Sequence, residues 1–150
     1  MSRVLPPGLF GADALRPGDR VQCGTVTVTS GMIDSFAALT GDCFEIHMSD
    51  AAAKTHGFDA RVAHGLLVLS LIDGLKNQAP AQMKARASMG WDWGFRAPVL
   101  LGDAITVAYD ITDIAPAKSE DQAILTLDFS VTNQRAQQVQ RGSNRLLAYR

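Results

Sequence analysis

Asp42 and His47 are the side chains of this sequence best suited to acid–base chemistry. Imidazole titrates near neutral pH and a carboxylate can orient or activate water, so such a pair can move protons at one substrate. On a continuous α-helix, positions five residues apart point about 140° away from each other. Because Gly41 precedes the pair, we expect a loop there that turns both side chains toward one point. The spacing alone does not distinguish a catalytic pair from two unrelated polar residues.

The segment Arg61-Val62-Ala63-His64-Gly65 lies directly before a long apolar stretch. A glycine at the start of a helix lets a ligand approach the backbone closely, and the unpaired N–H groups there favour negative charge. A thioester oxygen that becomes enolate-like carries such a charge, and its stabilisation often dominates catalysis. Gly65 is therefore a candidate oxyanion-binding residue, although it could equally serve only to permit tight helix packing.

A mixed α and β framework is predicted to position these residues. A strand is expected from about 19 to 29, with Gly24 as a bulge. Period-two alternation predicts further strands, which cover residues 91–95, 105–111, 123–131 and 139–149. Ser30 is expected to cap a helix that ends at Gly41, and a short helix is expected from Ser49 to Gly57.

Residues 64–76 are apolar nearly all round, which is typical of a helix wrapped by other structure. An antiparallel sheet around one long buried helix satisfies this order of elements, an α+β arrangement. Residues 1–17 are rich in Pro and Gly and are predicted to form an N-terminal leader over the surface, with the domain spanning 18–150.

The composition excludes several classes of function. The 150 residues suit one domain, and a net charge of −1 with scattered basic residues argues against a nucleic-acid partner. No apolar run approaches the roughly 20 residues of a membrane span, and no signal peptide is recognisable. Cys23 and Cys43 lack metal-ligand or redox spacing, so we expect a cytoplasmic protein without a metal site.

Several stretches together resemble the motif of the MaoC-like dehydratases, a family with the hot-dog fold that includes the (R)-specific enoyl-CoA hydratases. The similarity runs from about residue 18 to the end of the chain. The matching stretches are Phe36-Ala37-Ala38-Leu39-Thr40-Gly41-Asp42, Ile46-His47, Gly57-Phe58, Val62-Ala63-His64-Gly65-Leu66-Leu67, Phe95-Arg96-Ala97-Pro98-Val99 and Gly102-Asp103.

The resemblance implies addition of water to a trans-2-enoyl thioester, or dehydration of the 3-hydroxyacyl thioester, with a coenzyme A ester favoured over an acyl carrier protein. It implies that Asp42 and His47 hold the catalytic water and that the Gly65 N–H binds the thioester oxygen. His64 is expected to orient the same substrate-binding turn. No cofactor is expected beyond the coenzyme A of the substrate. The resemblance also implies a homodimer, or a higher homo-oligomer, with its sheets side by side.

Phe44-Glu45 stands where many members of the family have Asn-Pro. Phe44 is expected to be either a wall of the substrate pocket or a core residue. Glu45 is either a solvated loop residue or an acid aimed at a polar substrate. Two other functions on the same scaffold stay open, namely an acyl-CoA thioesterase and a catalytically silent acyl-CoA-binding subunit.

Overall fold

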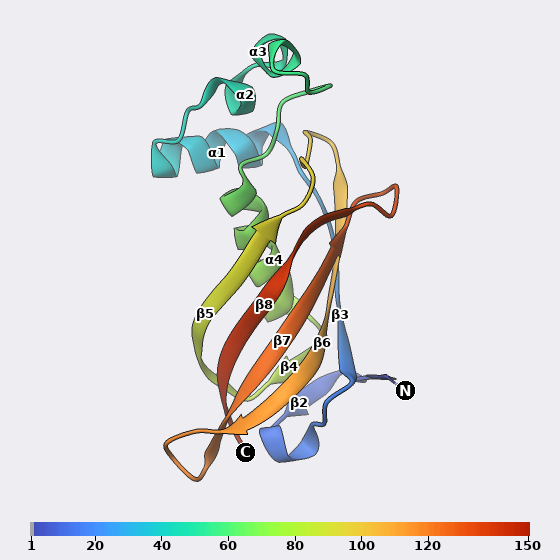
Figure 1. Cartoon of the computed structure of the whole chain (residues 1–150), viewed down its shortest axis with the longest axis vertical. Coiled ribbons are helices and arrows are strands. Elements are labelled where there is room, and N and C mark those ends of the chain that lie inside the picture. Colours follow the sequence, from blue (N-terminus) through green and yellow to red (C-terminus); the bar gives the residue numbers. More distant parts are fainter. Residues whose placement is uncertain (1) are drawn as a thin grey trace.

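A six-stranded sheet forms the body of the protein in the computed structural model, which describes residues 2–150 (Figure 1). Its strand order is β1-β3-β6-β7-β8-β5, and every neighbouring pair is antiparallel except β1 with β3. The strands are β1 (Arg3–Val4), β3 (Asp19–Thr27), β5 (Ala85–Phe95), β6 (Ala104–Pro116), β7 (Gln122–Thr132) and β8 (Gln138–Tyr149). The predicted strands are confirmed, and the register shift between Gln22 and Gly24 confirms the expected bulge.

The helix α4 (Gly65–Gln78) lies along one face of this sheet (Figure 1). Leu67, Val68 and Ile72 point into the core that α4 shares with the sheet. The expected α+β arrangement around one long helix is therefore confirmed. The helix is not buried on every side, since Leu66 is 61% exposed.

Three shorter helices lie at one end of the sheet, next to the start of α4 (Figure 1). They are α1 (Ser30–Thr40), α2 (Glu45–Met48) and α3 (Asp50–Thr55). Gly41, with φ of 80°, ends α1 as expected. The cap of α1 differs from the expectation, because the Thr29 hydroxyl and not Ser30 accepts the N–H of Met32, at 3.2 Å.

His47 lies in the short helix α2 where a loop was expected. A single helical turn is too short to show helical periodicity, so the sequence pattern could not reveal it. The chain between Gly41 and Phe44 is irregular, as expected. The loop that carries Asp42 is therefore shorter than predicted, and α2 fixes the backbone of His47.

Residues 2–17 do not merely lie over the surface as a leader, because part of this segment pairs with the domain. β1 pairs with β3, and β2 (Gly8–Phe10) pairs with β4 (Ala81–Met83) in a second, two-stranded sheet. Leu5, Ala12 and Leu15 are buried in the common core. These apolar side chains stabilise the segment against the domain, which is why the Pro- and Gly-rich composition misled the prediction.

An ion pair also fixes this N-terminal segment. Arg3 donates through Nε and Nη2 to the carboxylate of Asp19, at 2.8 and 2.7 Å. The main-chain N–H of Arg16 donates to the same carboxylate at 2.9 Å. Burial alone would raise the pKa of Asp19, but the hydrogen bonds from Arg3 and Arg16 outweigh it, so the pKa is lowered.

Candidate active site

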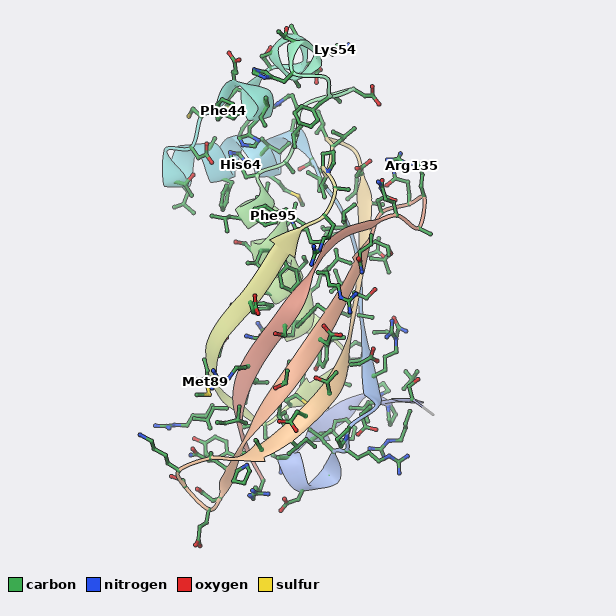
Figure 2. All side chains as sticks on the ribbon, viewed as in Figure 1. Phe44, Lys54, His64, Met89, Phe95 and Arg135 are labelled. Carbon is green, nitrogen blue, oxygen red and sulfur yellow. The ribbon has the colours of Figure 1, made fainter. Side chains whose placement is uncertain are left out.

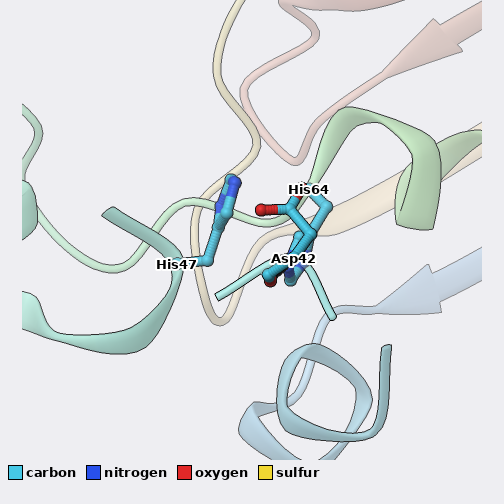
Figure 3. Close-up of side chains that lie close together, drawn as sticks. All are labelled: Asp42, His47 and His64. Carbon is cyan, nitrogen blue, oxygen red and sulfur yellow. Dashed lines mark hydrogen bonds between the residues drawn. The ribbon is translucent and has the colours of Figure 1, made fainter. Parts of the chain in front are cut away.

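Three side chains from three segments converge at the helical end of the molecule (Figure 3). Asp42 lies on the loop after α1 and His47 lies on α2. His64 is the residue that caps the N-terminus of α4. One ligand atom of each lies within 4.8 Å of the others. The structure thus brings together Asp42, His47 and His64, all three of which the sequence singled out.

The ring of His47 is held in one orientation by the main chain. Its Nδ1 lies 2.6 Å from the carbonyl oxygen of Val62. A carbonyl oxygen only accepts, so Nδ1 carries the proton, and in the neutral ring Nε2 keeps its lone pair. The Val62 N–H in turn donates to the carbonyl of Ile46 at 3.0 Å. His47 therefore offers an oriented proton acceptor from a side chain that is 8% exposed.

His64 connects the Asp42 loop to the start of α4. Its Nε2 donates to the main-chain carbonyl of Asp42 at 2.8 Å. Its ring stacks on that of His47, with centroids 3.9 Å apart and planes 25° apart. Among residues 2–150, the Nδ1 of His64 is the one buried side-chain polar atom without a hydrogen-bond partner in the protein. Buried polar atoms usually have partners, so this acceptor is a candidate contact for a polar group of a ligand.

Gly65 begins α4 directly after His64. The N–H of the first helical residue has no carbonyl partner within the helix, and the helix dipole places partial positive charge there. A Cβ at Gly65 would lie 2.4 Å from the ring of Phe95. Both interpretations from the sequence therefore apply to Gly65, since it offers a free N–H and also permits close packing.

A cavity of about 570 Å³ opens at these residues. Most of its wall is apolar, which suits an aliphatic chain. The lining residues are Asp42, Ile46, His47, Phe58, Val62, Ala63, His64, Gly65, Leu66, Phe95, Arg96, Ala97, Pro98, Val99 and Gln140. Asp42, His47, His64 and Gly65 thus share one apolar cavity.

Phe44 does not line this cavity, and it is not a core residue either. It directly precedes α2, and its ring is 53% exposed beside the rings of His47 and His56, at 6.1 and 6.0 Å (Figure 2). The expectation of a core residue is therefore wrong, and the expectation of a pocket wall is not met at this cavity. Glu45 pairs with His56 at 2.6 Å and also lies outside the cavity lining, so it is not aimed at a substrate there.

Sequence reasoning missed Gln140 and the role of the Val62 carbonyl. Gln140 lies on β8, is 2% exposed and donates to the carbonyl of Gly65 at 3.1 Å. Its own Oε1 accepts from the indole N–H of Trp93 at 2.8 Å. This chain of hydrogen bonds fixes the first turn of α4. No local sequence pattern predicts the bond between Gln140 and Gly65, because the two residues are 75 positions apart.

Asp42, His47 and His64 are also residue types that bind metal ions. The two rings, however, lie in nearly parallel planes, and imidazole lone pairs lie in the ring plane. Their lone pairs therefore do not converge on one point, and a metal ion bound to both would require one ring to rotate. The arrangement as it stands suits proton transfer better than chelation.

Comparison with known proteins places this site in a family. The sequence model described as "MaoC like domain" matches residues 14–132. This chain belongs to the MaoC-like family. The (R)-specific enoyl-CoA hydratase of Aeromonas caviae is 34% identical over 104 residues, which are 68% of this chain and 72% of that enzyme. The 3-hydroxybutyryl-CoA dehydratase of Methylorubrum extorquens is 31% identical over 61% of this chain and 57% of its own length.

Solved structures superpose on most of this chain. The (R)-hydratase of A. caviae has a TM-score of 0.74 and 28% identity, and the match covers 89% of this chain and 96% of that one. A Mycobacterium tuberculosis protein with a double hot-dog fold has a TM-score of 0.81 at 16% identity, over 97% of this chain and 46% of that one. The expected hot-dog fold is confirmed.

Proposed function

We propose that this chain is a hydro-lyase that adds water to a trans-2-enoyl thioester, or dehydrates the 3-hydroxyacyl thioester, with a coenzyme A ester as substrate. The observation that carries the proposal is the meeting of Asp42, His47 and the Gly65 N–H at one apolar cavity. Relatives named as an enoyl-CoA hydratase and a hydroxybutyryl-CoA dehydratase, at 34% and 31% identity, support it.

In this proposal Asp42 and His47 share the water that adds to the double bond. The fixed Nδ1–H of His47 leaves its Nε2 to accept a proton from that water while the oxygen bonds to the β-carbon. Asp42 accepts the second hydrogen bond of the water. A proton then goes to the α-carbon from the protonated member of the pair, which restores both groups.

The thioester carbonyl would lie against the Gly65 N–H. Hydration and dehydration both place negative charge on that oxygen, and a fixed donor in an apolar site stabilises it. The bond from Gln140 to the Gly65 carbonyl keeps this turn in place. His64, in contact with both Asp42 and His47, positions the two halves of the site relative to each other.

The test is the loss of conjugated-enoyl absorbance with a panel of trans-2-enoyl-CoA esters, run on wild type, Asp42→Asn and His47→Gln. Either substitution should lower kcat by about 10²–10⁴ with the fold intact, as expected for general acid–base catalysis. Folded wild-type protein that hydrates none of the esters would contradict the proposal. Free thiol in a trapping assay would indicate a thioesterase, and ligand-induced stabilisation without turnover a silent binding subunit.

We also propose that two copies associate through β5. This strand is the last in the sheet order, so one of its edges has no strand partner within residues 2–150. Met89 and Phe95 on β5 are exposed apolar residues (Figure 2), and the exposed Leu66 on α4 lines the same cavity as Phe95. A second copy would pair with the edge and cover them.

The cytoplasmic location suggested by the cysteines stays a prediction. No helix within residues 2–150 is long and apolar enough to cross a membrane.

A further inference from the structure

Arg61 connects all three short helices at the active-site end. Its Nε donates to the main-chain carbonyl of His47 in α2 at 2.7 Å. Its Nη2 forms an ion pair with Asp34 of α1 at 2.5 Å, and its main-chain N–H donates to Asp50 of α3 at 2.8 Å. The side chain of Arg61 is only 12% exposed. A nearly buried guanidinium with these partners has a fixed place in the fold.

The helix that carries His47 needs such external support. α2 has four residues, and so short a helix is unstable by itself. The last carbonyls of a helix have no partner within it, and a cation there also interacts favourably with the helix dipole. Arg61 supplies the hydrogen bond to one of these carbonyls, that of His47.

Two adjacent residues, Arg61 and Val62, thus fix the main chain and the ring of His47. Arg61 binds its main-chain carbonyl, and the Val62 carbonyl accepts from its ring Nδ1. A shift of the α2 backbone would lengthen the ring hydrogen bond and turn Nε2 away from the cavity. Arg61 itself does not line the cavity, so any effect on the reaction passes through His47.

We infer that Arg61 is a positioning residue, which holds the main chain of His47 so that its ring stays fixed against Val62 and presents Nε2 to the cavity. The inference rests on the proposed function for its effect on turnover. The planar fork of arginine allows Nε and Nη2 to reach two partners in fixed directions, whereas the single ammonium of lysine serves both less well. The residue type therefore matters, and not only the charge.

Steady-state hydration kinetics of Arg61→Ala, Arg61→Lys and Asp34→Asn test the effect on turnover. A misplacement of about 1 Å can cost about a hundredfold in rate. Arg61→Ala should lower kcat by about 10–100-fold with KM within about twofold, and Arg61→Lys should recover part of this loss. Asp34→Asn should show a smaller loss. Arg20→Ala is the matched control, because it removes a comparable Arg–Asp pair, with Asp110 at 2.9 Å on the sheet, and should leave kcat unchanged.

Nuclear magnetic resonance of protein with ¹⁵N-labelled histidine tests the position of the ring without any substrate. Wild type should show His47 as a single tautomer protonated on Nδ1, and Arg61→Ala should show a mixture of tautomers. A loss of kcat with an unchanged His47 spectrum, or no change in either, would overturn the inference. If wild type hydrates no ester, the proposed function fails, while a changed tautomer still supports positioning. If Arg61→Ala does not fold, Arg61→Lys and Asp34→Asn decide both readouts.

Discussion

His47 and His64 show how single residues acquire different roles from the same chemistry. Each ring uses one nitrogen to donate to a main-chain carbonyl, Nδ1 to Val62 in His47 and Nε2 to Asp42 in His64. The remaining nitrogen of each ring is an acceptor in the neutral form. That of His47 is proposed to take the proton of water, and that of His64 is buried without a protein partner.

Gly65 permits a test that separates packing from catalysis. Gly65→Ala places a Cβ against the ring of Phe95 and should lower the free energy of unfolding by about 1–3 kcal/mol, the usual range for overpacking. Adding Phe95→Leu should recover stability, because the smaller side chain makes room. Hydration should stay low in the double variant, because the Cβ still obstructs the approach to the N–H. Activity that returns together with stability in urea unfolding would show that Gly65 serves packing alone.

At the scale of elements, the ends of α1, α2 and α4 place the residues of the site. α1 ends where the Asp42 loop begins, α2 carries His47, and the start of α4 presents His64 and Gly65. Their ends are therefore as important as their lengths. The caps were predictable in kind, since Ser, Thr and Gly mark helix ends, but the exact residue depended on the backbone.

The cap of α1 gives a prediction with a neighbouring control. Thr29→Ala removes the hydroxyl that accepts the Met32 N–H and should lower the free energy of unfolding by about 1 kcal/mol. Ser30→Ala, one residue later and inside the helix, should change stability by less than about 0.5 kcal/mol. Chemical denaturation of the two variants measures both values. If Ser30→Ala lowers the free energy of unfolding as much or more, the N-cap is Ser30, as the sequence suggested, and not Thr29.

At the scale of the whole molecule, the N-terminal segment closes the core and the edge of β5 offers a surface for pairing. Residues 3–15 close one end of the core, through β1, β2 and the buried Leu5, Ala12 and Leu15. Asp19 links this segment to the sheet through Arg3. At the opposite end of the sheet order, one edge of β5 has main-chain groups without a strand partner within residues 2–150.

Asp19 makes the closure of the N-terminal segment dependent on pH. The pKa of Asp19 is lowered in the folded protein, so its charge stabilises the fold above the unfolded pKa of about 3.9, and this contribution is lost as pH falls through the folded pKa. Asp19→Asn should lower the free energy of unfolding by about 1.5–3 kcal/mol near pH 7. The difference from wild type should shrink as the pH falls below about 4. A difference independent of pH in urea unfolding would exclude the charge as its cause.

The proposed dimer predicts about twice the monomer mass in light scattering at micromolar concentration, since each chain is 16.1 kDa. Met89→Asp places a charge on the exposed β5 side chain, which is 47% accessible in the single chain, and should shift the mixture toward monomer. Wild-type protein that scatters as a monomer would contradict the association. Lys54→Asp, on the exposed helix α3 away from β5, is the control and should leave the mass unchanged (Figure 2).

The sequence by itself determined the local elements and the chemical pair. Period-two alternation revealed β6, β7, β8 and the second half of β5, and Gly41 marked the end of α1, because these signals are carried by neighbouring residues. The types of Asp42, His47 and Gly65 indicated the chemistry, and the stretches around them indicated the family, which the match over residues 14–132 confirms.

Only the tertiary structure decided how these residues meet. It placed His64 on the ring of His47, Gln140 behind Gly65, and Arg61 against the backbone of α2. It left Phe44 and Glu45 outside the cavity lining and buried part of the segment that composition suggested would lie over the surface. The physical reason is that hydrogen bonds to main-chain carbonyls and packing between distant strands leave no pattern in neighbouring residues. They exist only once the sheet has brought those segments together.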